Sequence, residues 1–454
     1  MRSTMRGWVA IGGRREAGPE RAALRSFQRA ARCSQGYRDH LEYHGVDHRA
    51  VRHLAEVPYT DKRSVFSDDI EPWLTGGRVA DAAELITSSG SSGLFSLGVT
   101  SHSERRTQER AIDATLRALG ATENSPTLLL NCLPMGITVP TRLATVATPS
   151  VHVEMATELL GRAGRRFDRV VIASEPLFLK ELAETALRLH GPEFSDRVVA
   201  CFVGGEWVAE SWRRYVAGLF GFAPDERSRA GVLVSMGAAE AGLHVLTEST
   251  ALRAVRGACD SQGGRDRMFG EDRGYTPLLL EWDDRRIHLE EREHADGART
   301  LVATSLERRL MPLVRYDLDD EGCILSPEHV NTALADLGCD VRIDAPIAAV
   351  WGRRATRVQG EGWSLRPEAV KEGLFGTAAH AGTLTGRFRI GVDDGVPQVH
   401  VQLRDGGRPA PRLESHLSEL IAATTGAPVR VRIHQYREYP FHDAGDFQHK
   451  PAYV

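Results

Sequence analysis

The first apolar positions of the chain recur at helical spacing. Leu24, Phe27, Ala30 and Ala31 lie three or four residues apart within the segment from Glu20 to Glu42. This spacing places them on one face of a helix, so we expect one or two amphipathic helices at the start of the chain. A second, short helix is expected after Val57, capped by Thr60 or Asp61.

A serine- and glycine-rich loop separates two apolar runs further along. The runs cover Ala82 to Ile86 and Leu94 to Val99, and the sequence from Ile86 to Gly93 reads I-T-S-S-G-S-S-G. A helix from Glu104 to Leu119 and a buried strand from Thr127 to Leu130 are expected next.

From Arg169 onward, short apolar runs alternate with helical patterns. The expected elements are a strand at Arg169 to Ala173, a helix at Pro176 to His190, a strand at Arg197 to Val203, a helix at Glu210 to Phe220 and a strand at Val232 to Met236. Alternation of this kind predicts an α/β fold with mostly parallel sheets and helical crossovers. Ligands bind at the carboxyl ends of the strands in such folds, which draws attention to the loops at Val203 to Trp207 and Ser235 to Glu240.

The pattern changes in the last third of the chain. Short strands are expected near Leu278 to Trp282, Arg286 to Glu290 and Arg299 to Thr304. The final hundred residues then combine a helix at Pro367 to Leu374, a hairpin at Gly386 to Val392 and Gln398 to Leu403, a helix at Arg412 to Thr425 and a strand at Val429 to His434. This mixture predicts a small α+β lobe, and we place the domains at 1–353 and 354–454.

Composition limits the classes of function. The chain has 454 residues, 42% hydrophobic residues and a formal net charge of −4, so it has no general electrostatic affinity for nucleic acid. No run of eighteen or more apolar residues occurs, and no signal-peptide pattern follows the N-terminal M-R-S-T-M-R-G-W, so we expect no membrane contact and a cytoplasmic location. The six cysteines form no C-x-x-C pair, which argues against a zinc site or a disulfide framework.

The serine loop is the first candidate for chemistry. Its hydroxyls and glycine-freed N–H groups, from Ser88, Ser89, Gly90, Ser91, Ser92 and Gly93, are suited to wrap the oxygens of a triphosphate. The same composition also describes a flexible linker. Lysines are scarce in this chain, with only Lys62, Lys180, Lys371 and Lys450, so each deserves individual inspection as a point charge at a reacting centre.

Five motifs in order resemble those of the adenylate-forming superfamily of acyl-CoA synthetases, most closely its phenylacetate-CoA ligase-like branch. The serine loop is similar to that family's S-S-G-T-T-G, and the others are G-G-E at Gly204, Gly205 and Glu206, M-G-A-A-E at Met236 to Glu240, R-Y-D-L-D-D at Arg315 to Asp320, and G-R at Gly352 and Arg353. The resemblance covers the chain from V-P-Y-T-D-K to Val454. It implies a large nucleotide- and acid-binding domain followed by a mobile lobe that closes over it.

The resemblance also implies roles for individual residues. ATP would be bound by the serine loop, by the G-G-E loop, by Met236, Gly237 and Ala238, by Asp320 through the ribose hydroxyls and by Arg353. Glu240 would be catalytic by holding Mg²⁺, for which a carboxylate oxygen is suited. Each has an ordinary alternative: Glu240 as a helix N-terminal carboxylate, Asp320 as a turn residue beside Asp317 and Asp319, and Arg353 as a surface arginine.

Departures from the family pattern are as informative as the matches. Met236 stands where the family has an aromatic that stacks on adenine, Ala239 replaces a threonine, and Thr356 replaces the hinge aspartate. Counting from Pro440 puts Asp446 at the position of the catalytic lysine, and Lys450 lies four residues later. Lys450 is therefore either a displaced catalytic lysine or part of a flexible terminus.

Together these features predict an enzyme that activates a carboxylic acid, aromatic or aliphatic, with ATP and Mg²⁺. The expected acceptor is CoA, a carrier-protein thiol or an amine, and a homodimer is the assembly to test. Two other classes stay open: a synthetase that uses the adenylate to form an amide, and a nucleotide-binding relative that has lost catalysis. The wall of the acid pocket is expected to include Leu133 to Thr138 and Trp207.

Overall fold

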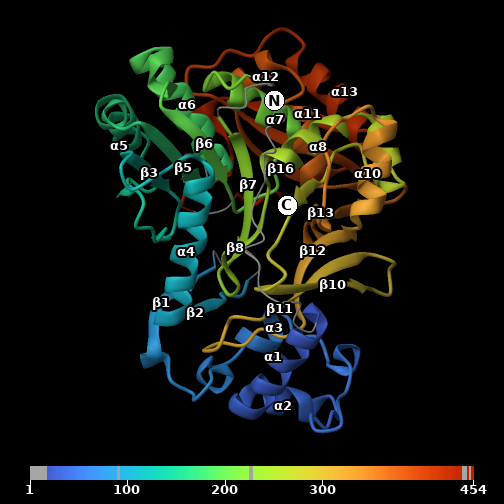
Figure 1. Cartoon of the computed structure of the whole chain (residues 1–454). Coiled ribbons are helices and arrows are strands. Elements are labelled where there is room, and N and C mark those ends of the chain that lie inside the picture. The colour runs from blue at the N-terminus through green and yellow to red at the C-terminus, as the bar shows by residue number, and fades with distance from the viewer. Residues whose placement is uncertain (1–17, 89–92, 224–228, 442–446, 449–450) are drawn as a thin grey trace.

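A six-stranded sheet forms the centre of the molecule. The computed structural model describes residues 18–88, 93–223, 229–441, 447–448 and 451–454. The strand order is β4-β3-β5-β6-β7-β8, in which the first five strands are parallel and β8 is antiparallel to β7 (Figure 1). The bounds are β3 Thr127–Cys132, β4 Thr145–Ala147, β5 Arg169–Ser174, β6 Val198–Val203, β7 Gly231–Ala238 and β8 Gly242–Thr247. Every residue of β3 is buried, as expected for a parallel strand covered on both faces.

Helices cover this sheet, and local sequence signals fix where several of them begin. They are α4 His102–Ala118, α5 Val153–Glu158 with the π-helical segment Leu159–Ala163 and the turn Gly164–Arg166, α6 Pro176–His190 with the turn Pro192–Ser195, α7 Glu210–Leu219, α8 Thr250–Ala258 and α9 Gln262–Phe269. Helix α6 follows the cap residue Glu175, has proline at its first position and ends before Gly191, whose φ is +71°. In α4 the side chains of Ser101 and Glu104 cap each other's backbone N–H groups.

The second large sheet is antiparallel, and it is built from the part of the chain where short strands were expected without a predicted direction of pairing. Its order is β10-β11-β12-β13-β9, with β9 Leu278–Leu280, β10 Ile287–Glu293, β11 Arg299–Ser305, β12 Tyr316–Leu325 and β13 Ile347–Arg353. Helix α10, Pro327–Asp336, connects β12 to β13. Consecutive strands can pair through hairpins here because no long helical crossover separates β10, β11 and β12. The predicted α/β class is nevertheless confirmed by the central sheet.

The N-terminal helices lie at the far end of the second sheet, at the bottom of Figure 1. They are α1 Pro19–Cys33, α2 Gln35–Tyr43 and α3 Lys62–Phe66, followed or interrupted by single turns at Leu54–Glu56, Glu71–Trp73 and Val79–Asp81. Asp61 caps α3, one of the two predicted caps. The neighbouring Thr60 joins the sheet edge: its N–H donates to Arg315 O (3.0 Å) and its hydroxyl to Val314 O (2.9 Å).

The serine loop joins the two strands of a small hairpin, β1 Ala82–Thr87 and β2 Leu97–Ser101. The last part of the chain, residues 354–454, forms what we call the lobe. It contains β14 Val358–Gly360, β15 Trp363–Leu365, α11 Pro367–Leu374, α12 Ala378–Thr383, β16 Leu384–Asp393, β17 Val396–Leu403, α13 Leu413–Thr425 and β18 Arg430–His434, with turns at Arg354–Thr356 and Tyr436–Glu438. Strands β16, β17 and β18 form one sheet, antiparallel between β16 and β17 and parallel between β17 and β18.

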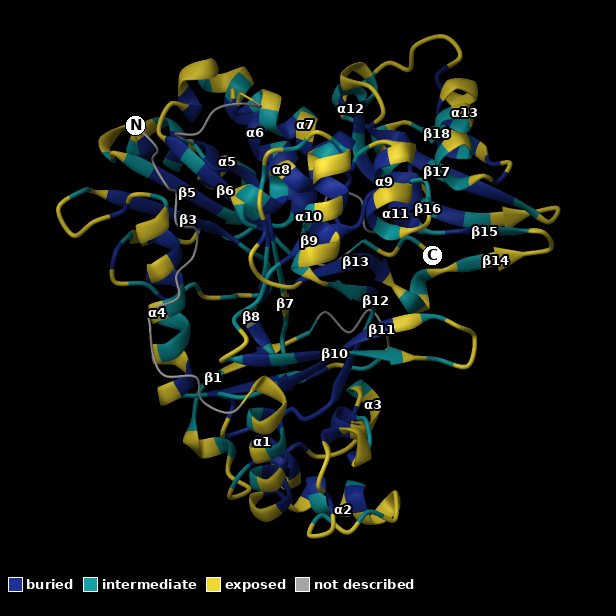
Figure 2. Ribbon diagram, turned by 45° about the vertical axis from the view of Figure 1, so that its right-hand side comes forward, coloured by how far each residue is buried: buried dark blue, intermediate teal, exposed yellow. Residues whose placement is uncertain are grey.

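Burial follows this layering. The strands of both large sheets are mostly buried, whereas the outer faces of the helices are exposed (Figure 2). One hydrophobic core runs from Ala23 in α1 to Val431 in β18, and so includes residues of the lobe as well as of the larger part. Among the described residues, no helix is both long enough and apolar enough to cross a bilayer.

Candidate active site

One cavity of about 940 Å³ lies at the carboxyl edge of the central sheet. Its walls come from the ends of β5, β6 and β7, from the β1–β2 hairpin, from the start of β12 and from the end of the chain. Because the register pairs Ser174 with Val203, the loops that follow β5 and β6 meet at this edge. The sequence-based expectation that ligands bind at the strand ends therefore leads to this cavity.

The G-G-E loop requires its glycines. A Cβ on Gly204 would lie 2.8 Å from Ser235 O in the neighbouring strand, and Gly205 has a φ of +90°. Both features favour glycine, because other residues would be strained or would overlap the strand. Glu206 follows and lines the cavity, next to Glu175 at the end of β5. Burial, with a further contribution from Glu206, raises the pKa of Glu175 to about 8.

Glu240 sits at the turn between β7 and β8, facing the cavity. Both of its carboxylate oxygens accept hydrogen bonds, one from Ser96 Oγ (2.8 Å) and one from Tyr316 OH (2.7 Å). Burial and the adjacent carboxylate of Glu240 raise the pKa of Tyr316, which therefore stays a donor. The carboxylate is thus held rigidly at the cavity wall, an arrangement that suits the predicted magnesium role without testing it.

A lysine stands beside Glu240. Lys62 Nζ donates to Ser88 Oγ (3.3 Å), and Ser88 Oγ also accepts from Ser96 N (2.9 Å). Burial lowers the pKa of Lys62, and the charge of Glu240 opposes that shift. Lys62 was noted in the sequence only as one of four lysines, so this cation at the base of the serine loop is a site residue that the motifs missed.

Only the ends of the serine loop can be placed. Ser88 lines the cavity, and Gly93 has a φ of +78° with no atom within 4 Å of a Cβ added there. Ser89, Gly90, Ser91 and Ser92 lie outside the described residues. Their predicted contact with phosphates stays a prediction.

Three aspartates at the start of β12 occupy different positions. Asp317 and Asp319 line the cavity, and Asp319 has a φ of +58°. Asp317 accepts hydrogen bonds from Arg292 Nη1 (2.9 Å) and Asp319 N (3.0 Å). Asp320, the predicted ribose ligand, pairs across the sheet with Arg353, whose Nε lies 3.9 Å from Asp320 Oδ1.

The remaining predicted residues divide into two groups. Gly237, Ala238 and Arg353 line the cavity, as does Thr356. The side chain of Met236 packs against the hydrophobic core, as expected because neighbouring strand residues point to opposite faces. The side chain of Met236 therefore does not face the cavity, as an aromatic residue that stacks on adenine would have to do.

An apolar arm extends the cavity between α4 and one face of the central sheet. It is lined by Ile112, Thr115, Leu116, Leu129, Val139, Val171 and Phe202. Ile112, Leu116, Leu129 and Val171 belong to a small hydrophobic cluster of their own, apart from the main core. The hydroxyl of Thr115 is already bonded to Ala111 O in its own helix (3.1 Å), so the arm offers a ligand no free polar group.

The structure brings part of the predicted acid-pocket wall to the cavity. Leu133, Pro134, Met135 and Ile137 line the cavity. Trp207 does not: it is buried and packs edge-on against Tyr275, with ring centroids 5.2 Å apart. Its neighbour Glu206 turns to the cavity instead.

The end of the chain closes one side of the cavity. Phe447, Pro451, Ala452, Tyr453 and Val454 all line it. Gln448 Oε1 accepts from Met135 N (3.1 Å), and Tyr453 OH donates to Glu206 Oε2 (2.6 Å). Asp446 and Lys450 lie outside the described residues. No local pattern pointed to Tyr453, because its hydroxyl's partner, Glu206, is 247 residues away in the sequence.

Comparison with known proteins supports the fold. No protein-family model matches the chain, and no curated protein matches it either. Among solved structures it is similar to 2-hydroxyisobutyryl-CoA ligase in the postadenylation state in complex with R3-HIB-AMP, with a TM-score of 0.67, 13% identity, and coverage of 96% of this chain and 89% of that one. An open conformation of that ligase in complex with 2-HIB-AMP and CoA gives a TM-score of 0.55, with 14% identity over 95% and 91% of the two chains. Its thioesterification state in complex with 2-HIB-AMP and CoA gives 0.52, with 13% identity over 94% and 88%.

The chain therefore has the fold of an acyl-CoA ligase, and the resemblance to the adenylate-forming superfamily is confirmed at the level of the fold.

Proposed function

We propose that this protein activates an apolar carboxylic acid with ATP, forming an acyl-adenylate, and then transfers the acyl group to the thiol of CoA with release of AMP. The observation that carries the proposal is that a single cavity joins a polar end, with Lys62, Ser88 and Glu240, to an apolar arm. A nucleotide and an acid could thus meet in one site. The likeness in fold to a ligase that was crystallised with an acyl-AMP supports the same reading.

The chemistry explains why both ends are needed. A carboxylate is a poor electrophile, because its oxide is a poor leaving group. Attack of the carboxylate oxygen on the α-phosphate of ATP forms the acyl–O–P bond, breaks the bond to the β-phosphate and releases pyrophosphate. Cations placed where negative charge develops lower the barrier for this step. In this chain Lys62 and Arg353 line the polar end, and both are suited to that task.

The residues present fit a magnesium ion. Glu240 presents one fixed carboxylate next to Lys62 and Ser88, and Mg²⁺ in nucleotide sites commonly takes one or two carboxylates, with phosphates and water as its other ligands. Within the described residues no group of three or more His, Cys, Asp or Glu side chains could hold a metal by itself. Glu240 would hold the ion together with phosphate oxygens, and the bound ion would neutralise phosphate charge.

The arm favours an aliphatic or aromatic acid without polar groups at its distal end. Burying an unpaired hydroxyl or amide against such a wall costs roughly 1–3 kcal/mol. A second carboxylate, which carries a full charge, would cost more. An aryl acid, as in the phenylacetate-CoA ligase-like branch, satisfies these conditions. CoA is the acceptor we favour, ahead of a carrier-protein thiol or an amine.

Two observations favour a second candidate, a nucleotide-binding protein without ligase activity. Asp446 stands at the family's lysine position in the sequence, and Met236 packs into the core instead of facing the cavity. Loss of both features would weaken adenylation more than nucleotide binding.

Pyrophosphate exchange with ATP separates the two candidates. We expect exchange with phenylacetate, hexanoate or octanoate, and much weaker exchange with acetate, 2-hydroxyisobutyrate and succinate. Calorimetric titration with ATP provides the second measurement. Binding of ATP without exchange for any acid would favour the binding protein, and absence of both would contradict each candidate.

A further inference from the structure

Among the described residues, charged side chains cross the contact between the lobe and the rest of the molecule at several places, including Arg366 with Glu321 and Arg354 with Asp296. Three further contacts involve helices α6, α7 or α11. In the first, Lys371 of α11 and Tyr453 meet Glu206. In the second, Glu372 of α11 caps helix α7. In the third, Lys180 and Glu184 of α6 meet the lobe.

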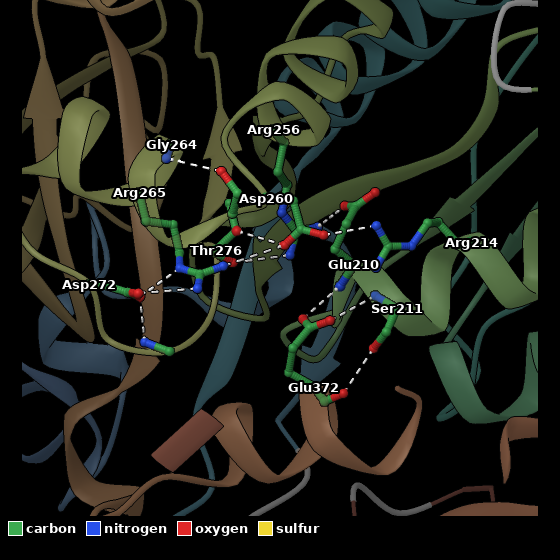
Figure 3. Close-up of polar contacts among 12 residues, drawn as sticks. Glu210, Ser211, Arg214, Arg256, Asp260, Gly264, Arg265, Asp272, Thr276 and Glu372 are labelled. Carbon is green, nitrogen blue, oxygen red and sulfur yellow. Dashed lines mark hydrogen bonds and ion pairs between the residues drawn. The ribbon is translucent and has the colours of Figure 1, made fainter. Parts of the chain in front are cut away.

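The second contact is drawn in Figure 3. The two carboxylate oxygens of Glu372 accept from the backbone N–H groups of Glu210 and Ser211, each at 2.9 Å, and Ser211 Oγ donates to Glu372 O (3.1 Å). A carboxylate at the start of a helix is favourable, because free N–H groups and the positive end of the helix dipole meet there. Beside it, Glu210 pairs with the fully buried Arg256.

The third contact is also buried. Lys180 Nζ donates to Leu384 O at the start of β16 (2.7 Å) and pairs with Glu184 Oε1 (2.9 Å), while Arg404 Nε lies 3.5 Å from Glu184 Oε2. Lys180, Glu184, Arg404 and Glu372 are all absent from the cavity wall. Both of these contacts therefore hold the lobe without touching a ligand.

The first contact is different because it forms part of the cavity wall. Glu206 Oε2 accepts from Lys371 Nζ (2.7 Å) and from Tyr453 OH (2.6 Å), and both donors belong to the lobe. The side chains of Glu206 and Lys371 are only 8% and 11% exposed, so their attraction is weakly screened. Glu206 and Tyr453 themselves line the cavity.

The same cluster fixes the end of the chain to the lobe sheet. Tyr453 O accepts from Ile390 N (2.7 Å), and its ring stacks on Phe388 with centroids 4.4 Å apart. Lys371 Nζ lies 4.3 Å from the centre of the same ring. Tyr453 is thus held by the lobe through its ring and backbone, and by Glu206 through its hydroxyl alone.

We propose that Lys371 and Tyr453 are positioning residues that act through Glu206: together they hold the lobe and the end of the chain across the cavity in the arrangement that activates the acid. This inference rests on the proposed function. Because its bonds are polar, the cluster can be rehydrated when the lobe moves away for thioester formation, whereas an apolar contact would resist separation. A ligand that displaces Glu206 would remove this one of the contacts that hold the lobe, so cavity occupancy and lobe position are coupled at this carboxylate.

The test measures lobe position without depending on catalysis. Fluorophores introduced as non-natural amino acids at Leu189 of α6 and Val392 of β16, which are 59% and 55% exposed, report the distance between the two parts by energy transfer in the full-length protein. We expect Lys371→Met and Tyr453→Phe to broaden and lengthen this distance, and Lys371→Arg to preserve it. Tyr453→Phe keeps the stacked ring, so it should fold even where Lys371→Met does not.

A double-mutant cycle distinguishes this cluster from general loosening. If Lys371 acts through Glu206, the variant Lys371→Met/Glu206→Gln should behave like either single variant, whereas Lys180→Met should add its own effect to Lys371→Met. In pyrophosphate exchange, Lys371→Met should lower kcat by about tenfold to a hundredfold, with a smaller change in KM for the acid. Lys371→Arg should recover most of the rate.

The outcomes separate the two proposals. A changed distance in protein that exchanges no pyrophosphate with any acid would support the cluster and overturn the proposed function. An unchanged distance in both Tyr453→Phe and Lys371→Met, or simple additivity between Lys371→Met and Glu206→Gln, would overturn the positioning role whatever the activity.

Discussion

Glu368, in the first turn of α11, lies directly over Gly352 near the end of β13. A Cβ on Gly352 would overlap the Glu368 carboxyl group, and Gly352 also has a φ of +133°, which is strained for other residues. The junction between the larger part and the lobe is therefore built on a glycine that the lobe's own helix covers. Burial raises the pKa of Glu368 to about 7.

This packing predicts the effect of Gly352→Ala. We expect it to lower the free energy of unfolding by about 1–3 kcal/mol more than Gly395→Ala does, because Gly395 also has a positive φ (+74°) but open space around it. Urea unfolding of both variants measures the difference. In the double variant Gly352→Ala/Glu368→Ala, removal of the Glu368 carboxyl group should relieve the overlap and recover part of the lost free energy of unfolding. Equal losses for Gly352→Ala and Gly395→Ala would contradict the packing explanation.

Glu175 predicts a pH dependence of stability. Its pKa is raised from 4.5 to about 8 in the folded protein, so its protonated form is favoured by folding, and this contribution is lost as the pH rises from about 4.5 through about 8. Glu175→Gln keeps an acceptor for the N–H groups of Leu177 and Phe178 but cannot ionise. Between pH 4.5 and 8.5 the free energy of unfolding, measured from denaturation curves, should fall less steeply with pH for the variant than for the parent protein. An equal slope in both proteins would rule out the raised pKa of Glu175.

Two lysines are candidates for the cation that we expect at the α-phosphate. Lys62 is placed beside Ser88 and Glu240, and we expect Lys62→Met to lower the exchange rate by on the order of 10²–10³-fold with ATP binding nearly intact, as for loss of one preorganised charge donor. Lys450 lies between Gln448 and Pro451, the second of which lines the cavity. If Lys450→Ala causes the loss instead, and Lys62→Met does not, the displaced lysine at the end of the chain takes this role.

The ribose ligand can be assigned among the aspartates of β12. Asp320→Ala should weaken ATP binding by roughly 1–3 kcal/mol if Asp320 accepts hydrogen bonds from the ribose hydroxyls. Asp317→Asn is the comparison, since Asp317 lines the cavity and Asp320 does not. Calorimetry that finds full affinity in Asp320→Ala and a loss in Asp317→Asn would move the assignment by three residues.

The apolar arm predicts a shift in acid preference. Val171 and Val170 are adjacent buried residues of β5 that face opposite sides of the sheet, and only Val171 lines the arm. Val171→Ala should raise the ratio of kcat/KM for longer acids to kcat/KM for shorter acids, and Val171→Phe should lower this ratio. The expected change is about 10-fold to 200-fold for each methylene of difference between the acids. Val170→Ala should lower the free energy of unfolding by a similar amount without changing the ranking of acids by kcat/KM. A changed ranking in Val170→Ala would indicate that the acid does not bind in the arm.

Local signals in the sequence were sufficient for much of the fold. Helices α6 and α11 were predicted with their observed bounds because Pro176 and Pro367 mark their first turns and Gly191 ends α6. The parallel strands β5 and β6 followed from their alternation with helices. The antiparallel second sheet did not follow, because which strands pair depends on contacts between segments, and the short strands there carry no signal for their partners.

Some residues of the candidate site could likewise be identified from the sequence, and others could not. Gly204 and Gly205 were identified from their motif, and the structure gives each a reason to be glycine. Lys62, Glu175 and Lys371 were not identified as site residues, since their meaning depends on partners such as Glu206, which is 165 residues from Lys371. The scarcity of lysine was the one signal that pointed to two of them.

The bond between Thr60 and Val314 has a consequence for the synthesis of the chain. Its two residues are 254 positions apart. At a translation rate of about 5–20 residues per second, the early segment emerges roughly 13–50 s before its sheet partner. During that interval the face of α1 that packs against β10 and β11 has no sheet to cover it, so the newborn chain exposes this face to the cell's chaperones until most of the remaining sequence has left the ribosome.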